Sequence, residues 1–185
     1  MSGAHNAISG VVHSRVNPIA DERGAFMETW RASTTDRAGV TFRQANLSRS
    51  KARVLRGMHF HERQVDLWIL LDGRASVALV DLRPAIRGDQ RMPPTERFEM
   101  TKGEVVLIPE RVAHGFLAIE PIELLYLVSN EYDGTDEYGF AWSDPDVALD
   151  WPARDPIVSG RDAGNPPFAE AVAAARQRDV TAVAR

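Results

Sequence analysis

Short strand-like runs separated by turn residues fill the middle of this chain. Between residues 68 and 129 these runs are, in order, WILL, RASVALVDL, EVVLIP, HGFLAI and ELLYLVS. Regularly spaced strands without intervening helices favour an antiparallel sandwich or barrel. The predicted fold class is therefore all-β.

Turn residues predict how these runs connect. Asp72-Gly73 is a favoured two-residue turn between alternating apolar segments and predicts a hairpin. A second turn is expected at residues 21–24, between strand-like stretches at 11–16 and 25–30. The segment 83–97 lacks periodicity and is expected to form a surface loop or an irregular hairpin.

One convincing helix is predicted near the end of the chain. It covers residues 168–178 and follows Pro166 and Pro167. Apolar residues within it recur at helical spacing, and basic residues lie near its end. No repeat or linker interrupts the chain, so one domain over residues 1–185 is expected.

Composition excludes several classes of function. The chain has 185 residues, a formal charge of −4 and no cysteine. Disulfides, thiolate catalysis, iron–sulfur clusters and thiolate-bound zinc are therefore excluded. The negative charge gives no reason to expect nucleic acid or an anionic membrane as a partner. Without a visible secretory signal or an apolar run of about 18 residues, a soluble cytoplasmic protein is expected.

Three histidines lie at strand-like positions beside turns. His59 and His61 are two residues apart, so in a strand both side chains point to the same face. Asp66 and His114 follow in other strand-like runs. One strand histidine is usually structural, whereas three in one small β domain favour a shared site. The spacing of His59, Asp66 and Gly73, and then of Gly103, Pro109 and His114, resembles the paired motifs of the cupin superfamily. In that superfamily, three histidines and a carboxylate bind one divalent metal ion.

A second resemblance covers nearly the whole chain and is more specific. Eight segments occur in the order typical of the dTDP-4-dehydrorhamnose 3,5-epimerase family: DERGAFMETW, FRQANLSRS, VLRGMHF, VDLRP, IPERVAHGF, ELLYLVSNEY, WSDPDVALDWP and VSGRDAGNPPF. This family implies a cupin-type jelly-roll β-barrel with a short C-terminal helix. It also implies a homodimer, an activity that needs neither metal nor cofactor, and a nucleotide-diphosphate keto sugar, dTDP-linked, as substrate.

The resemblance assigns roles in an epimerisation next to a C4 ketone. By its motif, His59 is the base and Asp162 is the carboxylate partner that orients the imidazole. Tyr126 matches the acid on the opposite face of the sugar. Arg56 adds positive charge near the keto sugar or a phosphate.

Further substrate contacts are implied in two N-terminal stretches. They are Arg23, Phe26 and Glu28 in ERGAFMET, and Gln44 and Asn46 in RQANLS. An arginine suits a diphosphate because its forked guanidinium matches paired anionic oxygens. Taken singly, most of these residues fit a turn, a strand end or a core position equally well. Their joint occurrence in family order favours binding.

Two residues depart from the family pattern. The family has glutamine where this chain has His61, and lysine where it has Asp66. That lysine helps to stabilise the enolate, so an acid in its place removes a cation where negative charge develops. His61, Asp66 and His114 are expected to line the substrate pocket. The pair of changes is compatible with a restored metal site, a hydrogen-bonded His–Asp pair, a different sugar or inversion at one carbon only.

Two alternative functions stay open from the sequence. The first is a metal-dependent cupin isomerase or oxygenase with His59, His61, Asp66 and His114 as ligands. In that case His59 cannot also be a free base. The second is a sugar-nucleotide binding protein that has lost catalysis, supported only by the missing lysine.

Overall fold

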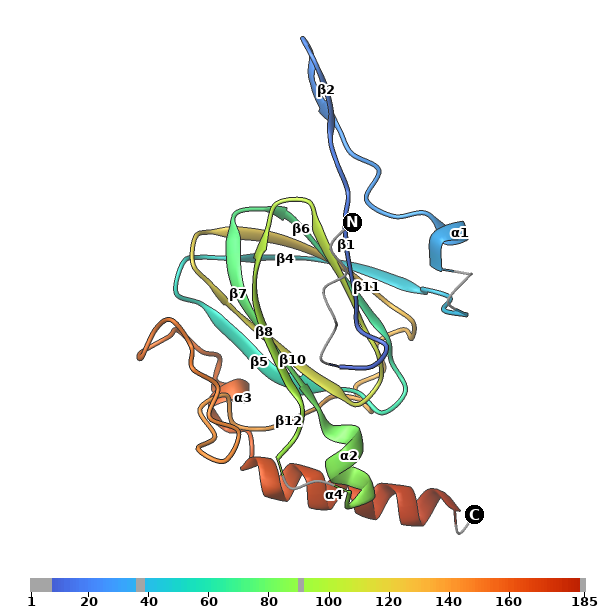
Figure 1. Ribbon diagram of the computed structural model, residues 1–185, viewed down its shortest axis with the longest axis vertical. Helices are drawn as coiled ribbons and strands as arrows, with labels where there is room; N and C mark the ends of the chain where they lie inside the picture. The colour runs from blue at the N-terminus through green and yellow to red at the C-terminus, as the bar shows by residue number, and fades with distance from the viewer. Residues whose placement is uncertain (1–7, 36–38, 90–91, 184–185) are drawn as a thin grey trace.

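The computed structural model describes residues 8–35, 39–89 and 92–183, and its main body is two five-stranded sheets that face each other (Figure 1). All pairings between the named strands of these two sheets are antiparallel. One sheet has the order β1 (Val12–Arg15), β9 (Glu104–Ile108), β6 (Asp66–Asp72), β11 (Ile122–Val128) and β4 (Gln44–Ser50). The other has the order β12 (Tyr138–Gly139), β5 (Leu55–Phe60), β10 (Val112–Ala118), β7 (Arg74–Asp81) and β8 (Thr95–Thr101). The all-β jelly-roll expectation is confirmed.

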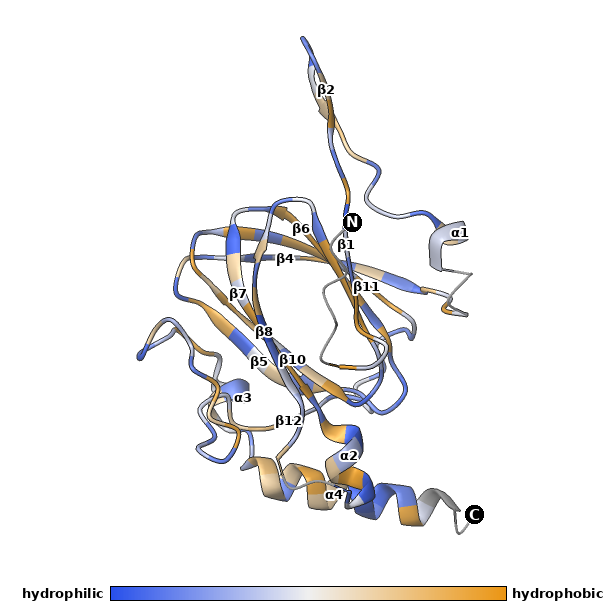
Figure 2. Ribbon diagram, viewed as in Figure 1, coloured by the Kyte–Doolittle hydropathy of each residue, from blue (hydrophilic) through white to orange (hydrophobic). Residues whose placement is uncertain are grey.

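Within the described residues, the core comprises three apolar clusters, the smallest formed by Leu67, Ile69, Val105 and Leu127 of the first sheet. Between the sheets, alternate strand residues form one apolar cluster that includes Trp68, Leu70, Val77, Leu79, Val106, Ile108 and Phe116. Behind the second sheet, another cluster joins β5 and β10 to the helices. Figure 2 shows the resulting pattern, with apolar residues along the strands and both apolar and polar residues on the C-terminal helix.

That helix, α4 (Phe168–Val183), is the one predicted from the sequence. Phe168, Val172 and Ala175 are buried, with Ala175 fully so. The apolar spacing therefore identified the face that covers the barrel. Among the described helices, none is long and apolar enough to span a membrane.

The predicted Asp72-Gly73 hairpin is wrong, because β6 and β7 belong to different sheets. β6 pairs with β9 and β11, whereas β7 pairs with β8 and β10. Gly73 adopts a positive φ of 81°, and an added Cβ would lie 2.1 Å from the carbonyl oxygen of Pro121. The turn thus passes the chain from one sheet to the other. Local alternation shows that both strands face a core, but it does not identify the strand beside each of them.

The prediction of a loop at residues 83–97 is also wrong at its start, where helix α2 (Leu82–Arg87) forms. The Asp81 carboxylate accepts a hydrogen bond from the backbone N–H of Arg83, and Gly88 ends the helix with φ 86°. Six residues are too few to show helical periodicity, but the Asp and Gly caps were a readable signal. Arg176 of α4 donates to carbonyl oxygens of α2 and joins the two helices.

The turn predicted at residues 21–24 is confirmed. It connects β2 (Ile19–Asp21) to β3 (Gly24–Phe26), and this hairpin projects away from the barrel (Figure 1). Ile19 and Phe26 are 73% and 68% exposed. Two short helices complete the described chain: α1 (Ala32–Thr35), after the hairpin, and α3 (Gly160–Ala163), before α4.

Candidate active site

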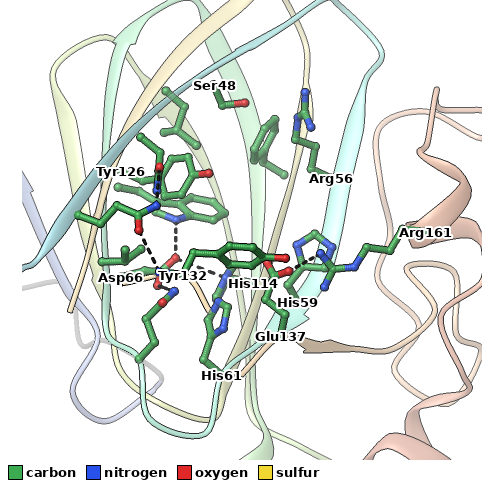
Figure 3. Close-up of a pocket in the computed structure, with 17 residues that line it drawn as sticks. Ser48, Arg56, His59, His61, Asp66, His114, Tyr126, Tyr132, Glu137 and Arg161 are labelled. Carbon is green, nitrogen blue, oxygen red and sulfur yellow. Dashed lines mark hydrogen bonds and ion pairs between the residues drawn. The ribbon is translucent and has the colours of Figure 1, made fainter. Parts of the chain in front are cut away.

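A cavity of about 440 Å³ opens between the two sheets (Figure 3). Strands β4, β5, β6, β10 and β11 provide most of its wall, and the segment 132–137 and α3 complete it. The lining residues are Gln44, Asn46, Ser48, Arg56, His59, His61, Gln64, Asp66, Trp68, His114, Phe116, Leu124, Tyr126, Val128, Tyr132, Glu137 and Arg161. This volume is ordinary for a small-molecule site.

His59 and Asp162 form a close pair at one wall of the cavity. His59 lies on β5 and its side chain is 22% exposed, while the Asp162 side chain on α3 is 4% exposed. His59 Nε2 lies 2.6 Å from Asp162 Oδ1, and the other carboxylate oxygen accepts from the Gly57 backbone N–H. With Nε2–H donating to the carboxylate, the lone pair of the neutral imidazole is on Nδ1.

The charge state of Asp162 suits this role. Burial alone would raise the pKa of Asp162, but the hydrogen bonds from His59 and from the Gly57 N–H outweigh it and lower the pKa below its usual value. Asp162 is therefore ionised at neutral pH and stabilises a protonated His59. Ser159 caps α3 by accepting from the Asp162 backbone N–H, which fixes the position of the carboxylate.

Tyr126 lies on β11, in the other sheet, and the close-up shows it across the cavity from His59 (Figure 3). Burial raises the pKa of Tyr126, and the negative charges of Asp66 and Glu137 raise it further, against a smaller opposite effect of Arg56. The phenol is therefore protonated at neutral pH and can donate a proton or a hydrogen bond.

His61, Asp66 and His114 form a buried cluster that also lines the cavity. One ligand atom from each lies within 4.8 Å of the others. Burial lowers the pKa of His114 to about 4, with the other two histidines adding to the effect and Asp66 opposing it. His114 is thus neutral at physiological pH. Of the four residues in the predicted metal set, His59 is not part of this cluster, and its Nε2 is hydrogen-bonded to Asp162.

The structure divides the predicted substrate contacts into two groups. Gln44, Asn46 and Arg56 line the cavity, and Gln44 donates to Asn46 at 2.8 Å. Arg23, Phe26 and Glu28 do not line it, since they lie on or just after the projecting hairpin. The two charged residues pair locally, Arg23 with Asp21 and Glu28 with Arg31.

Several residues that line the cavity were not predicted from the sequence. Trp68 and Phe116 each follow a predicted site residue by two positions in a strand, so alternation was a signal that could have found them. Tyr132, Glu137 and Arg161 come from segments without periodicity. Of these, Arg161 and Glu137 form an ion pair at 2.7 Å.

A jelly-roll barrel whose cavity holds a carboxylate-bound histidine opposite a protonated tyrosine defines a cupin-type protein with a site suited to acid–base chemistry. The family model for dTDP-4-dehydrorhamnose 3,5-epimerase matches residues 5–170. This chain belongs to that family, and it is an isomerase of the carbohydrate epimerase class.

Individual relatives agree with this assignment. The dTDP-4-dehydrorhamnose 3,5-epimerase of Pseudomonas aeruginosa is 32% identical over 184 residues, which is 92% of this chain and 98% of the relative. The solved epimerase from Mycobacterium tuberculosis has a TM-score of 0.80 at 27% identity and covers 98% of this chain and 99% of its own. The Legionella pneumophila enzyme, solved in complex with dTDP-4-keto-L-rhamnose, has a TM-score of 0.76 at 26% identity, covering 88% of this chain and 89% of its own.

Proposed function

We propose that this chain epimerises a nucleotide-diphospho-4-keto-6-deoxy sugar, dTDP-linked, at C3, C5 or both. The observation that supports it most is the placement of a paired base and a protonated acid on opposite sheets of one cavity. A relative with the same fold binds a dTDP-4-keto sugar. The metal-dependent cupin function with His59 as a ligand has no support from the relatives, and His59 is not part of the buried cluster of His61, Asp66 and His114.

The proposed reaction follows from the two side chains. His59 Nδ1 removes the proton next to the C4 ketone, and ionised Asp162 stabilises the imidazolium that forms. The electron pair moves to the C4 oxygen and gives an enolate. Tyr126 then donates its phenolic proton to the carbon from the opposite face, which inverts the configuration.

The direct test of this function is hydrogen exchange in heavy water. The protein is incubated with a dTDP-4-keto-6-deoxyhexose, and proton NMR follows the signals of H3 and H5. We expect deuterium at one or both carbons, and the position of the label reports which centre reacts. Binding of the nucleotide sugar without any exchange would contradict the proposal and favour a binding protein.

Replacement of Tyr126 by phenylalanine separates the two proton transfers. The phenol that returns the proton is lost, whereas His59 and Asp162 are untouched. We therefore expect the rate of epimer formation to fall about 10²- to 10³-fold and the rate of deuterium exchange catalysed by His59 to fall less. Comparison of the two rates in one NMR experiment checks this. Equal losses of exchange and inversion would argue against Tyr126 as the acid.

We also propose a homodimer in which the β2–β3 hairpin completes the cavity of the partner. The hairpin projects from its own barrel, Phe26 is largely exposed, and Arg23 and Glu28 do not line the cavity of their own chain. In such a dimer, Arg23, Phe26 and Glu28 would contact the substrate in the cavity of the partner.

Mixing two inactive variants tests this arrangement. One variant is His59→Asn, and the other carries Arg23→Ala and Phe26→Ala. In a heterodimer, the hairpin of the first chain meets the intact pocket of the second, so an equal mixture refolded together should recover about a quarter of wild-type activity. A mixture with no more activity than its parts would contradict the shared site.

A further inference from the structure

Three hydrogen-bond acceptors converge on one point at the inner wall of the cavity. They are one ring nitrogen of His61, one ring nitrogen of His114 and the carboxylate of Asp66. The residues come from three places in the sequence, and all are between 4% and 6% exposed. Figure 3 shows the three side chains directed toward one another.

The backbone fixes which imidazole nitrogens face this point. His61 Nδ1 is hydrogen-bonded to the carbonyl oxygen of Asp136, and His114 Nδ1 to the carbonyl oxygen of Val112 at 3.1 Å. A carbonyl oxygen can only accept, so each Nδ1 carries the proton and each Nε2 presents a lone pair. Histidines that bind metals are typically held in this way, by a donated bond from the other ring nitrogen.

Asp66 adds a negative charge to the two lone pairs. Its oxygens accept from Gln64 Nε2 at 2.8 Å and from Trp68 Nε1 at 3.3 Å, and both donors are neutral. In the described part of the chain, no lysine or arginine forms an ion pair with Asp66. The carboxylate lies 3.7 Å from His114 Nε2, which has no proton to donate. A buried negative charge facing two lone pairs calls for a cation.

We propose that His61, His114 and Asp66 bind one divalent transition-metal ion, such as Zn²⁺, Co²⁺ or Ni²⁺, at the inner wall of the cavity. Two imidazoles and one carboxylate suit these ions better than Mg²⁺ or Ca²⁺, which prefer oxygen ligands. Ligand distances of about 2.1 Å around a tetrahedral ion imply ligand atoms about 3.4 Å apart. The Asp66–His114 pair already meets this within 0.3 Å, and the whole set lies within 4.8 Å. Small side-chain rotations therefore complete the site.

This site leaves the base free. His59 is not part of this cluster of ligand atoms, and its Nε2 is hydrogen-bonded to Asp162. A bound ion and a basic His59 are therefore compatible, and an ion held by these three residues would be accessible from the cavity that they line. The ion would place positive charge beside the substrate in the region where Asp66 otherwise contributes a negative one.

The test measures metal binding directly and does not depend on turnover. Protein stripped with a chelator is titrated with Zn²⁺ against a chromophoric chelator, and the Co²⁺ form is examined for the visible absorption of a nitrogen- and oxygen-ligated ion. We expect one ion per chain in the wild type. Asp66→Asn and His114→Gln should each weaken Zn²⁺ binding by at least about 100-fold, since each removes a ligand.

Two control variants make the result specific. His13→Gln removes a histidine that pairs with Glu96 outside the cavity, and His59→Asn removes the base. Both should keep one ion per chain, and His59→Asn should do so while losing hydrogen exchange. Circular dichroism establishes that each variant is folded. Failure of the folded wild type to bind Zn²⁺ or Co²⁺, equal binding by Asp66→Asn, or loss of binding in His59→Asn would each overturn the proposal, whatever the outcome for epimerisation.

Discussion

Replacement of His59 by asparagine is expected to lower the rate of epimerisation by about 10³-fold or more and to abolish label exchange next to the ketone. Among the histidines that line the cavity, His59 is hydrogen-bonded to a carboxylate that is ionised, and its Nδ1 presents a lone pair. A positioned base typically contributes 10²- to 10⁴-fold. Asparagine is smaller than histidine, so it removes the basic nitrogen without filling the cavity. The measurement is deuterium incorporation by NMR under saturating substrate.

Asp162→Asn provides the companion to this experiment. It leaves the imidazole in place but removes the charge that stabilises its protonated form, so we expect a smaller loss, of about 10²-fold. His13→Gln should have no effect, since His13 pairs with Glu96 outside the cavity. Substantial exchange in His59→Asn would show that another group is the base.

Replacement of Gly73 by alanine is expected to destabilise the protein by about 3 to 5 kcal/mol. Two costs combine at this position. The φ of 81° is unfavourable for any residue with a Cβ, and the new methyl group would lie 2.1 Å from the Pro121 carbonyl oxygen and 3.0 Å from Ile122 Cγ2. The Pro121 oxygen belongs to backbone, so it cannot rotate away as a flexible side chain would. Urea unfolding followed by fluorescence measures the change in free energy.

Gly88 provides a matched control for the steric part. Its φ of 86° is nearly the same, but an added Cβ meets only an Arg176 nitrogen at 3.9 Å. Gly88→Ala should therefore cost only the backbone term, about 1 to 2 kcal/mol. Similar losses in the two variants would show that the contact with Pro121 relaxes.

The sequence predicted the fold class because apolar alternation reports burial directly. It did not predict the pairing of β6 and β7, because a turn dipeptide describes two residues and not the sheet to which each strand belongs. α2 was not predicted because six residues are too few to show helical periodicity, so that only its capping residues indicate the helix. Thus patterns of burial were reliable, whereas connectivity and very short elements were not.

For the site, the motifs identified side chains that the fold then brings together. His59 and Asp162 are 103 positions apart, and only the family resemblance linked them before the structure did. The two-residue spacing of His59 and His61 correctly placed both in one cavity, but it did not reveal that they have different partners. Arg161 and Glu137 were not predicted because the segments that contain them show no periodicity in the sequence.

The attachment of Asp162 to α3 has a consequence for how the enzyme loses activity. His59 belongs to barrel strand β5, whereas Asp162 belongs to a short helix outside the barrel. A serine cap, the bonds from His59 and Gly57 to Asp162 and the Arg161–Glu137 pair hold this helix in place. Segments with few buried contacts open at a lower free-energy cost than central strands do. Brief detachment of α3 would therefore interrupt the reaction while both sheets remain intact. Inactivation by mild denaturant should then precede the spectroscopic melting of the barrel, so that activity reports a local opening equilibrium and not global unfolding.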